Sequence, residues 1–343
     1  MKRIFAIFLV LTLLLTGCAA PIPVADTTRQ YTATFLNLFD TVTTIIGRAE
    51  SEEAFREISQ AIHDDLLHYH ELFDIYNDYE GVANIKTVND NAGIAPVKVD
   101  QAIIDLLRDC KAYYELSGGR VNVMMGSVLQ LWHAARNDGI NDPVHAKLPD
   151  MAQLTEASAH AYFDALVIDE AAGTVYISDP DARLDVGAVA KGWATQRAAE
   201  QAPSGMLLSV GGNVCATGPK LSDGTPWVIG IQDPDAADKN LHTVFVKGGA
   251  VVTSGDYQRT YWVDGKSYHH IIDPDTLMPA GYWRSVSVVC ADSGLADALS
   301  TALFLMDREA GSALAEQSGA EVLWVGLSGE EYMTPGFEEI KRT

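Results

Sequence analysis

The chain has little positive charge for its length. Its 343 residues include 24 lysines and arginines against 46 aspartates and glutamates, a formal net charge of −22 at pH 7. Nucleic-acid backbones need a basic face, and nothing in this sequence supplies one. A phosphate-bearing ligand is repelled as well unless backbone amides or a metal neutralise it. We therefore exclude nucleic acid as a partner and expect any phosphate-binding function to require a divalent cation.

Cysteine is also scarce, and the spacings typical of metal sites are missing. Cys110, Cys215 and Cys290 lie far apart in apolar surroundings, without CxxC spacing or nearby paired histidines. We interpret them as buried thiols, which disfavours a disulfide framework or a zinc- or iron-uptake lipoprotein. Three histidines on or near one predicted helix do not match HExxH, and we favour a solvated helix face over a metal cluster there: His63, His68 and His70.

Long apolar runs are confined to the N-terminus. Lys2 and Arg3 precede the apolar residues 4–15, a run too short for an ordinary transmembrane helix. Residues 15–18 read Leu-Thr-Gly-Cys, the order of a bacterial lipoprotein cleavage site. An uncleaved anchor is the alternative to removal of this segment.

The N-terminal pattern predicts the organisation of the whole chain. We expect a signal peptide over residues 1–17, lipidation at Cys18, a lipidated tether over residues 18–30 and one domain over residues 31–343. A protein of this kind is held at the cell membrane by its lipid anchor, on the extracytoplasmic face.

The remaining chain predicts an α+β fold with mixed or largely antiparallel sheets and flanking helices, because helices occur in blocks and strands in runs. Residues 32–46 read as a strand or hairpin and residues 77–96 as a loop. Helices are expected from Ser51, from Asp100, after Gly126, and over residues 191–202 and 294–306. Strands are expected over residues 165–168, 174–178, 206–210, 214–217, 227–232, 243–247, 250–253, 258–263, 285–290 and 321–325.

One loop between a predicted strand and a predicted helix stands out. Residues 185–193 read Asp-Val-Gly-Ala-Val-Ala-Lys-Gly-Trp. Gly187 and Gly192 leave room for a ligand near the backbone, the start of a helix favours anions, and Lys191 adds a positive charge. An ordinary strand-to-helix turn with a surface lysine is equally compatible with this motif taken alone.

Four later segments supply groups that suit a metal and phosphate site. They are residues 209–213 with a glycine pair and Asn213, residues 253–259 with hydroxyls and an arginine, residues 269–274 with an imidazole three residues before a carboxylate, and residues 297–301. Asp297 and Thr301 are spaced i and i+4 and share one face of a predicted helix. Mg²⁺ prefers such oxygen ligands and usually shares substrate phosphates. Each segment alone also fits a turn, a hairpin or a helix cap.

Together and in this order, the segments resemble the ApbE-type FAD:protein FMN transferases. The resemblance rests on residues 184–192, 209–213, 253–257, 270–274 and 295–301, and upstream on 39–41, 73–76 and 119–123. It implies an ApbE-like fold with FAD in a central cleft. It also implies an enzyme that transfers FMN from FAD through a phosphoester to a threonine of a partner protein and releases AMP.

The same resemblance implies roles for individual residues. His270 matches the catalytic histidine, and Asp297, Thr301 and the Ala188 carbonyl match the ligands of Mg²⁺, which Mn²⁺ could replace. It assigns contacts with FAD to Ala188, Lys191, Gly192, Gly212, Asn213, Ser254, Gly255, Asp256, His270 and Ile272. The implied acceptors are redox proteins with a threonine motif: quinone reductase subunits, RNF-type complexes or extracellular electron-transfer proteins.

Two departures from the family pattern leave alternatives open. Residues 275–279 read Asp-Thr-Leu-Met-Pro where many members have Thr-Gly, and residues 76–89 lack the common Ser-Glu-Leu-Ser wording. Adenine contacts are therefore not assigned. A magnesium-dependent FAD pyrophosphatase and a non-catalytic FAD-binding lipoprotein remain alternatives, although His270, Asp297 and Thr301 together favour catalysis over binding alone.

Overall fold

The computed structural model describes residues 28–342, so the predicted signal peptide, Cys18 and most of the tether lie outside the described residues. The first strand already begins at Arg29, two residues before the predicted domain boundary. Among residues 28–342 there is no helix with the length and apolar character needed to span a membrane.

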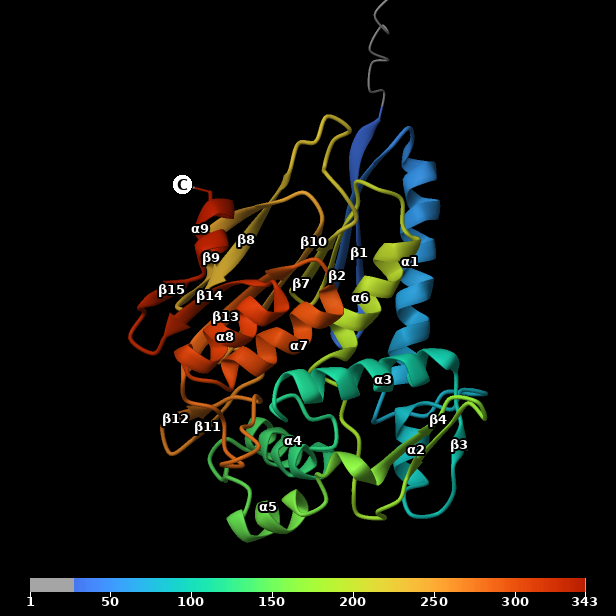
Figure 1. Ribbon diagram of the computed structural model, residues 1–343, viewed down its shortest axis with the longest axis vertical. Coiled ribbons are helices and arrows are strands. Elements are labelled where there is room, and N and C mark those ends of the chain that lie inside the picture. The colour runs from blue at the N-terminus through green and yellow to red at the C-terminus, as the bar shows by residue number, and fades with distance from the viewer. Residues whose placement is uncertain (1–27, 343) are drawn as a thin grey trace, which may run out of the picture.

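The centre of the fold is an eight-stranded sheet in which every pair of neighbours is antiparallel (Figure 1). The predicted hairpin after residue 32 forms its first two strands, and the predicted antiparallel α+β class is confirmed. In order across the sheet, the strands are β1 (Arg29–Leu38), β2 (Thr41–Ala49), β6 (Leu207–Val210), β7 (Asn213–Ala216), β10 (Gly249–Gly255), β13 (Trp283–Cys290), β14 (Glu321–Gly326) and β15 (Glu331–Met333).

Four helices cover one face of this sheet. They are α1 (Glu52–Phe73), α6 (Ala190–Gln201), α7 (Ser293–Phe304) and α8 (Arg308–Ser318). Helix α1 packs on β1 and β2, α6 on β6 and β7, α7 on β10 and β13, and α8 on β14. Ten of the twelve residues of α7 are buried, and Asp297 is the only charged residue among them, which makes it unusual.

The opposite face of the sheet is covered by a hairpin and a short helix. Strands β8 (Trp227–Asp233) and β9 (Ala236–Val246) pair with each other. Helix α9 (Pro335–Ile340) lies on the same face of the sheet. Their inward side chains, such as Ile229, Val244 and Phe337, pack on Val251 and Leu323 of the large sheet. The middle of the large sheet is therefore buried on both faces, whereas β1 keeps one face exposed.

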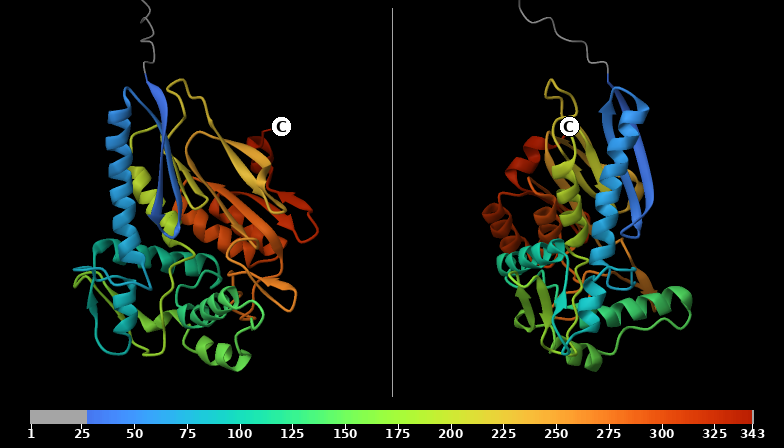
Figure 2. Two further views of the ribbon diagram at one scale, coloured as in Figure 1. Left: turned by 180° about the vertical axis from the view of Figure 1, so that it is seen from behind. Right: turned by 90° about the vertical axis from the view of Figure 1, so that its right-hand side faces the viewer.

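A second, smaller group of elements packs at one end of the sheet (Figure 2). It contains a three-stranded sheet and two hairpin strands. Two of its helices contribute Trp132 and Leu154 to a separate apolar cluster, and the other two pack into the main core through residues such as Ile85 and Ile103. The elements are α2 (Ile85–Asp90), β3 (Val97–Lys98), α3 (Gln101–Leu116), α4 (Gly126–Asn141), α5 (Met151–Ser158), η1 (Phe163–Ala165), β4 (Leu166–Asp169), β5 (Thr174–Ile177), β11 (Tyr261–Val263) and β12 (Lys266–Tyr268).

Several predicted boundaries are wrong for identifiable reasons. Residues 77–96 contain helix α2, because Asn84 and Thr87 form a capping box that starts a helix inside the polar stretch. Residues 258–260 are not strand, since Arg259 adopts a left-handed φ of 47°. Helices α8 and α9 were missed, although Asp307 caps α8 and Gly319 ends it in a left-handed conformation.

The prediction of three buried thiols is confirmed for two of the cysteines. All three described cysteines are free thiols; Cys110 and Cys215 are buried and Cys290 is partly exposed. The histidines after Ser51 do not form one solvated face: His63 is buried against Phe35, and His70 accepts a hydrogen bond from the Phe39 amide at 3.2 Å.

Candidate active site

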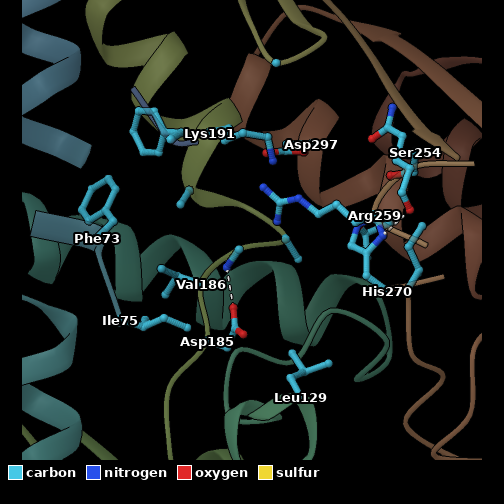
Figure 3. A pocket seen from close by; sticks show the side chains of 18 of the residues that line it. Phe73, Ile75, Leu129, Asp185, Val186, Lys191, Ser254, Arg259, His270 and Asp297 are labelled. Atoms are coloured by element: carbon cyan, nitrogen blue, oxygen red, sulfur yellow. Dashed lines mark hydrogen bonds between the residues drawn. The ribbon is translucent and has the colours of Figure 1, made fainter. Parts of the chain in front are cut away.

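A pocket of about 420 Å³ lies where the helical layer, the end of the large sheet and the smaller group of elements meet (Figure 3). Its volume falls in the range of about 300–1,000 Å³ typical of small-molecule sites. The three upstream segments that carry the resemblance all reach it, through Asp40, Tyr76 and Asn122 among others. Residues far apart in the sequence therefore converge on one cavity.

The loop from Asp185 to Lys191 forms one side of this pocket. Asp185 is fixed because its amide donates to the Val123 carbonyl at 2.8 Å and its carboxylate accepts from the Gly187 amide at 2.9 Å. This arrangement directs Ala188 and Lys191 into the pocket. The loop ends where helix α6 begins, so the first amides of that helix lie beside the cavity.

Asp297 reaches the same place from helix α7. Its carboxylate accepts a hydrogen bond from the Gly192 amide at 2.8 Å, so it caps the start of α6 across the interface between the two helices. A Cβ on Gly192 would lie 2.4 Å from the Asp297 Cβ, which explains why the loop has glycine here. Burial raises the pKa of Asp297, while Lys191 and the Gly192 amide act in the opposite direction.

The residues around Asp297 fit a hard divalent cation. Within residues 28–342, Asp297 is buried and forms no salt bridge, so its charge lacks a protein counter-ion in direct contact. Thr301, one turn later on α7, and Ala188 line the pocket beside it. A carboxylate, a hydroxyl and a carbonyl form the oxygen donor set that Mg²⁺ takes. The described residues contain one cluster of metal-ligand side chains outside this pocket's lining: His160, Asp179 and Asp181.

His270 faces the pocket from the opposite side. Its Nδ1 lies 3.2 Å from the Gln258 carbonyl, which can only accept, so Nδ1 carries the hydrogen and Nε2 has the free lone pair. Burial lowers the pKa of His270 to about 3, and the positive charges of Arg259 and Lys191 act in the same direction. The imidazole is therefore neutral at pH 7 and able to accept a proton at Nε2.

Hairpin geometry places Asn213 in the pocket. Gly211 and Gly212 both have left-handed φ values, 57° and 93°, as the tight turn between β6 and β7 requires. The Asn213 Nδ2 that follows is buried without a hydrogen-bond partner among residues 28–342. The Asn213 side chain also lowers the pKa of Asp297, so the amide lies beside that carboxylate, and a ligand bound there would meet both groups.

The structure brings most of the predicted site residues into the pocket lining but leaves four behind it. Three of the four are glycines that contribute no atoms to the lining: Gly192, Gly212 and Gly255. The fourth is Asp256, whose carboxylate pairs with Arg284 Nε at 2.8 Å. Their predicted contacts with FAD remain predictions. The lining contains eight predicted residues: Ala188, Lys191, Asn213, Ser254, His270, Ile272, Asp297 and Thr301.

Sequence reasoning missed several polar residues of the lining. Arg259 points into the pocket toward Lys191 and Asp297. The Tyr76 hydroxyl lies 2.7 Å from His133 Nδ1, and His133 Nε2 lies 3.8 Å from the Asp185 carboxylate. The arginine within residues 253–259 was a visible signal for Arg259, whereas nothing near His133 pointed to a site.

Comparison with known proteins defines the class to which this fold and pocket belong. The ApbE family profile matches residues 39–324, most of the chain. The computed structure superposes on the ApbE protein of Thermotoga maritima with a TM-score of 0.79 and 30% identity, covering 92% of this chain and 100% of the other. It superposes on the flavin transferase ApbE from Vibrio cholerae with a TM-score of 0.76; at 23% identity this likeness shows the fold alone.

Sequence relatives agree with the structural comparison. A FAD:protein FMN transferase of Treponema pallidum is 35% identical over 260 residues, covering 70% of each chain. A FAD:protein FMN transferase of Klebsiella pneumoniae is 30% identical over 241 residues, covering 68% of this chain and 72% of the relative. The chain belongs to the ApbE family. The predicted resemblance is thereby confirmed, as is the prediction that the protein is an enzyme.

Proposed function

We propose that this enzyme transfers FMN from FAD to a threonine of an acceptor protein, in a Mg²⁺-dependent reaction that forms a phosphoester and releases AMP. The relatives' names support FAD as the flavin donor and a protein as the acceptor. The observation that carries the proposal is the buried Asp297 across the pocket from the neutral His270, with Lys191 beside it. Phosphoryl transfer needs this combination of charge neutralisation and alignment more than it needs covalent participation by the protein.

In the proposed reaction, the threonine hydroxyl oxygen attacks the phosphorus of the FMN half. His270 Nε2 takes the hydroxyl proton, and the bond from that phosphorus to the bridging oxygen breaks. The electron pair of this bond leaves with AMP. A bound Mg²⁺, held by Asp297, Thr301 and the Ala188 carbonyl, would supply charge neutralisation at the phosphates. The charge of Lys191 and the positive end of the α6 dipole would attract the diphosphate.

The pocket also accounts for the expected side reaction. Water that reaches the same phosphorus would give FMN and AMP, and His270 could accept its proton equally well. The FAD pyrophosphatase alternative thus uses the same residues and differs only in the nucleophile. No feature of the pocket favours it over transfer.

The experiment that tests the proposal combines three readouts. The soluble part from Thr27 onward is incubated with FAD, Mg²⁺ and a domain bearing a threonine acceptor motif, with and without chelator. We expect a metal-dependent mass gain on the acceptor equal to FMN, together with covalent flavin fluorescence in a gel. FMN and AMP without acceptor labelling would replace transfer by hydrolysis, and bound intact FAD without products would leave only a flavin-binding protein.

We also propose that the enzyme is lipid-anchored through Cys18 on the extracytoplasmic face of the cell membrane, as residues 1–18 indicate. Its acceptors would then be membrane-associated redox proteins of the quinone reductase, RNF-type or extracellular electron-transfer classes. Metabolic labelling with a fatty acid tests this anchoring. The wild-type chain should incorporate label and the Cys18→Ala chain should not; equal labelling of both would contradict it.

A further inference from the structure

Strand β1 forms a long, unprotected edge of the large sheet (Figure 2). It has ten residues, and among residues 28–342 its only hydrogen-bonded neighbour in the sheet is β2. The strand at the opposite edge, β15, has three residues and begins with a glutamate. Short length, charged side chains and proline are common means of preventing an edge strand from pairing with another chain. Residues 30–38 contain no charged residue and no proline, so β1 has none of these three protections.

One face of this edge strand also presents apolar side chains to solvent. Phe35 and Thr43 are paired across β1 and β2, and both lie on the face that packs on helix α1. Because side chains alternate along a strand, the adjacent Leu36 and Val42 point to the other face. Leu36 is 75% exposed and Val42 is 52% exposed. The edge therefore combines unpaired backbone groups with two neighbouring aliphatic side chains that the described chain leaves uncovered.

The edge strand ends at the candidate active site. Directly after Leu38, the turn residues Phe39, Asp40 and Thr41 all line the pocket. Asp40 is also exposed to solvent, so this turn lies at the rim of the cavity. The turn is held in place because the Phe39 amide donates to His70 Nδ1 at 3.2 Å. A segment paired with the edge of β1 would therefore lead directly to the rim of the pocket.

These features suit the acceptor protein better than a second copy of this chain. A strand advances about 3.3 Å per residue, so six residues paired with β1 would span about 20 Å and leave the next residues at the rim. Main-chain pairing gives affinity with little demand on side chains, which suits acceptors that share only a short motif. Two copies joined at this edge would instead bring together two chains that each carry a formal charge of −22.

We propose that the acceptor protein docks by adding an extended segment to the free edge of β1, with its threonine beyond the end of that strand, at the turn of residues 39–41. The inference rests on the proposed function and identifies the surface that recognises the acceptor. The segment is uncharged, because residues 30–38 offer no counter-ion, and its apolar side chains cover Leu36 and Val42.

Hydrogen exchange measures this docking directly. In an antiparallel hairpin every second amide of the edge strand points away from its partner and exchanges readily. The full chain in detergent is incubated with FAD, Mg²⁺ and the flavin-accepting domain of an RNF-type complex, in which valine replaces the acceptor threonine so that no transfer occurs. We expect the edge amides of residues 29–38 to exchange about tenfold or more slowly when this domain is bound. The amides of β15, at the other edge, should be unchanged.

Charged variants of the edge then test its part in transfer to the unmodified domain. Thr34→Lys and Leu36→Lys place a charge on the edge strand, which opposes pairing. We expect each to raise the KM for the acceptor about tenfold with kcat nearly unchanged, as a loss of about 1.4 kcal/mol of binding implies. The dissociation constant for FAD should stay at its wild-type value, because neither residue lines the pocket. Leu327→Lys is the matched control, since Leu327 is 56% exposed in the turn between β14 and β15, at the other edge.

The outcomes separate this inference from the proposed function. Unchanged exchange in residues 29–38, in protein that transfers FMN to the unmodified domain, would overturn the docking surface alone. Slow exchange of the edge amides before the domain is added, in protein that is dimeric by light scattering, would assign the edge to a second copy and overturn the inference as well. Absence of transfer to any acceptor would overturn the proposed function and the docking surface with it. The exchange measurement uses wild-type protein, so it decides even if a lysine variant fails to fold.

Discussion

The pocket has two walls that differ in how their polar groups are satisfied. The helical wall, residues 185–192 and 297–301, forms its own hydrogen bonds: Gly187 donates to Asp185, and Gly192 donates to Asp297. The strand wall, residues 253–259 and 270–272, leaves the Tyr257 hydroxyl, one Asp256 oxygen and the Arg259 guanidinium without partners in the described chain. The helical wall is thus preorganised, whereas the strand wall presents Arg259 to the pocket without a protein partner among residues 28–342; Tyr257 and Asp256 lie behind the lining.

The helical wall is tested most directly by Asp297→Asn, for which we expect the largest effect. The amide keeps the size of the side chain and an acceptor for the Gly192 amide, but removes the only charge that would hold the metal. We expect FMN transfer to fall about a thousandfold or more and its dependence on Mg²⁺ to be lost. The measurement is the rate of acceptor labelling across a Mg²⁺ titration.

The cluster of His160, Asp179 and Asp181 supplies a matched control. Asp179 lies 2.7 Å from His160 Nδ1 and does not line the candidate active site, so Asp179→Asn should keep the wild-type rate and Mg²⁺ titration. A comparable loss in both variants would mean that the site with more clustered ligands is the functional one. The importance given to the helical wall would then be wrong.

The catalytic part of the strand wall is tested by His270→Ala. Removing a positioned general base costs about 10²–10⁴-fold in rate, and we expect a loss in this range with the Mg²⁺ titration unchanged, because the metal ligands lie on the other wall. Single-turnover labelling with saturating FAD gives the rate. Near-normal transfer would show that His270 does not accept the threonine proton.

The two walls also differ in how far the sequence predicts them. The spacing of Asp297 and Thr301 placed both on one helix face, and the glycines around Lys191 signalled a tight loop, because these features depend on local periodicity. Neither spacing nor propensity could show that Asp256 turns away to pair with Arg284, or that Arg136 approaches Arg259. Those contacts depend on tertiary packing between segments that are 28 residues apart in the first case and more than a hundred in the second.

The same contrast between local sequence patterns and long-range packing applies to the fold as a whole. The hairpin of β1 and β2 and helices α1, α3, α6 and α7 follow from periodicity and caps, and they were predicted within a few residues. Helix α8 was missed, although its cap and its terminal glycine lie in the sequence. The order of the eight strands is invisible to any local pattern, because β10 pairs with β7 and β13 across long connections.

The tight packing of the helical wall can be broken at Gly192. A Cβ there would lie 2.4 Å from the Ser293 carbonyl oxygen as well as from Asp297, so backbone must move to admit it. We expect Gly192→Ala to lower the free energy of unfolding by about 1–3 kcal/mol, measured by urea denaturation. On the strand wall, the atoms nearest to a Cβ at Gly255 belong to the ring of Tyr257, a side chain that can shift, so Gly255→Ala should cost less.

An open position serves as the reference for both alanine variants. Gly281 has nothing within 4 Å of an added Cβ, and Gly281→Ala should change the free energy of unfolding by no more than about 0.5 kcal/mol. If Gly192→Ala were as mild as Gly281→Ala, the interface between α6 and α7 would be looser than a preorganised wall requires.

The smallest effect we expect is a pH dependence that belongs to the strand wall. Burial lowers the pKa values of His269 and His270, the latter to about 3, so the unfolded chain binds protons there that the folded chain does not. Stability is then fully present above the unfolded value near 6.5 and is lost as the pH falls toward the folded values, by up to about 1 kcal/mol per pH unit for each imidazole. Asp297, whose pKa is raised, acts in the opposite sense: its contribution to stability grows as the pH falls toward the ordinary aspartate value.

Urea denaturation at pH 7, 6 and 5 should therefore show a shallower decline for His270→Asn than for wild-type protein. Identical slopes would mean that His270 is protonated in the folded state near pH 6, and the strand wall would then present a cation in place of the proton acceptor that transfer requires.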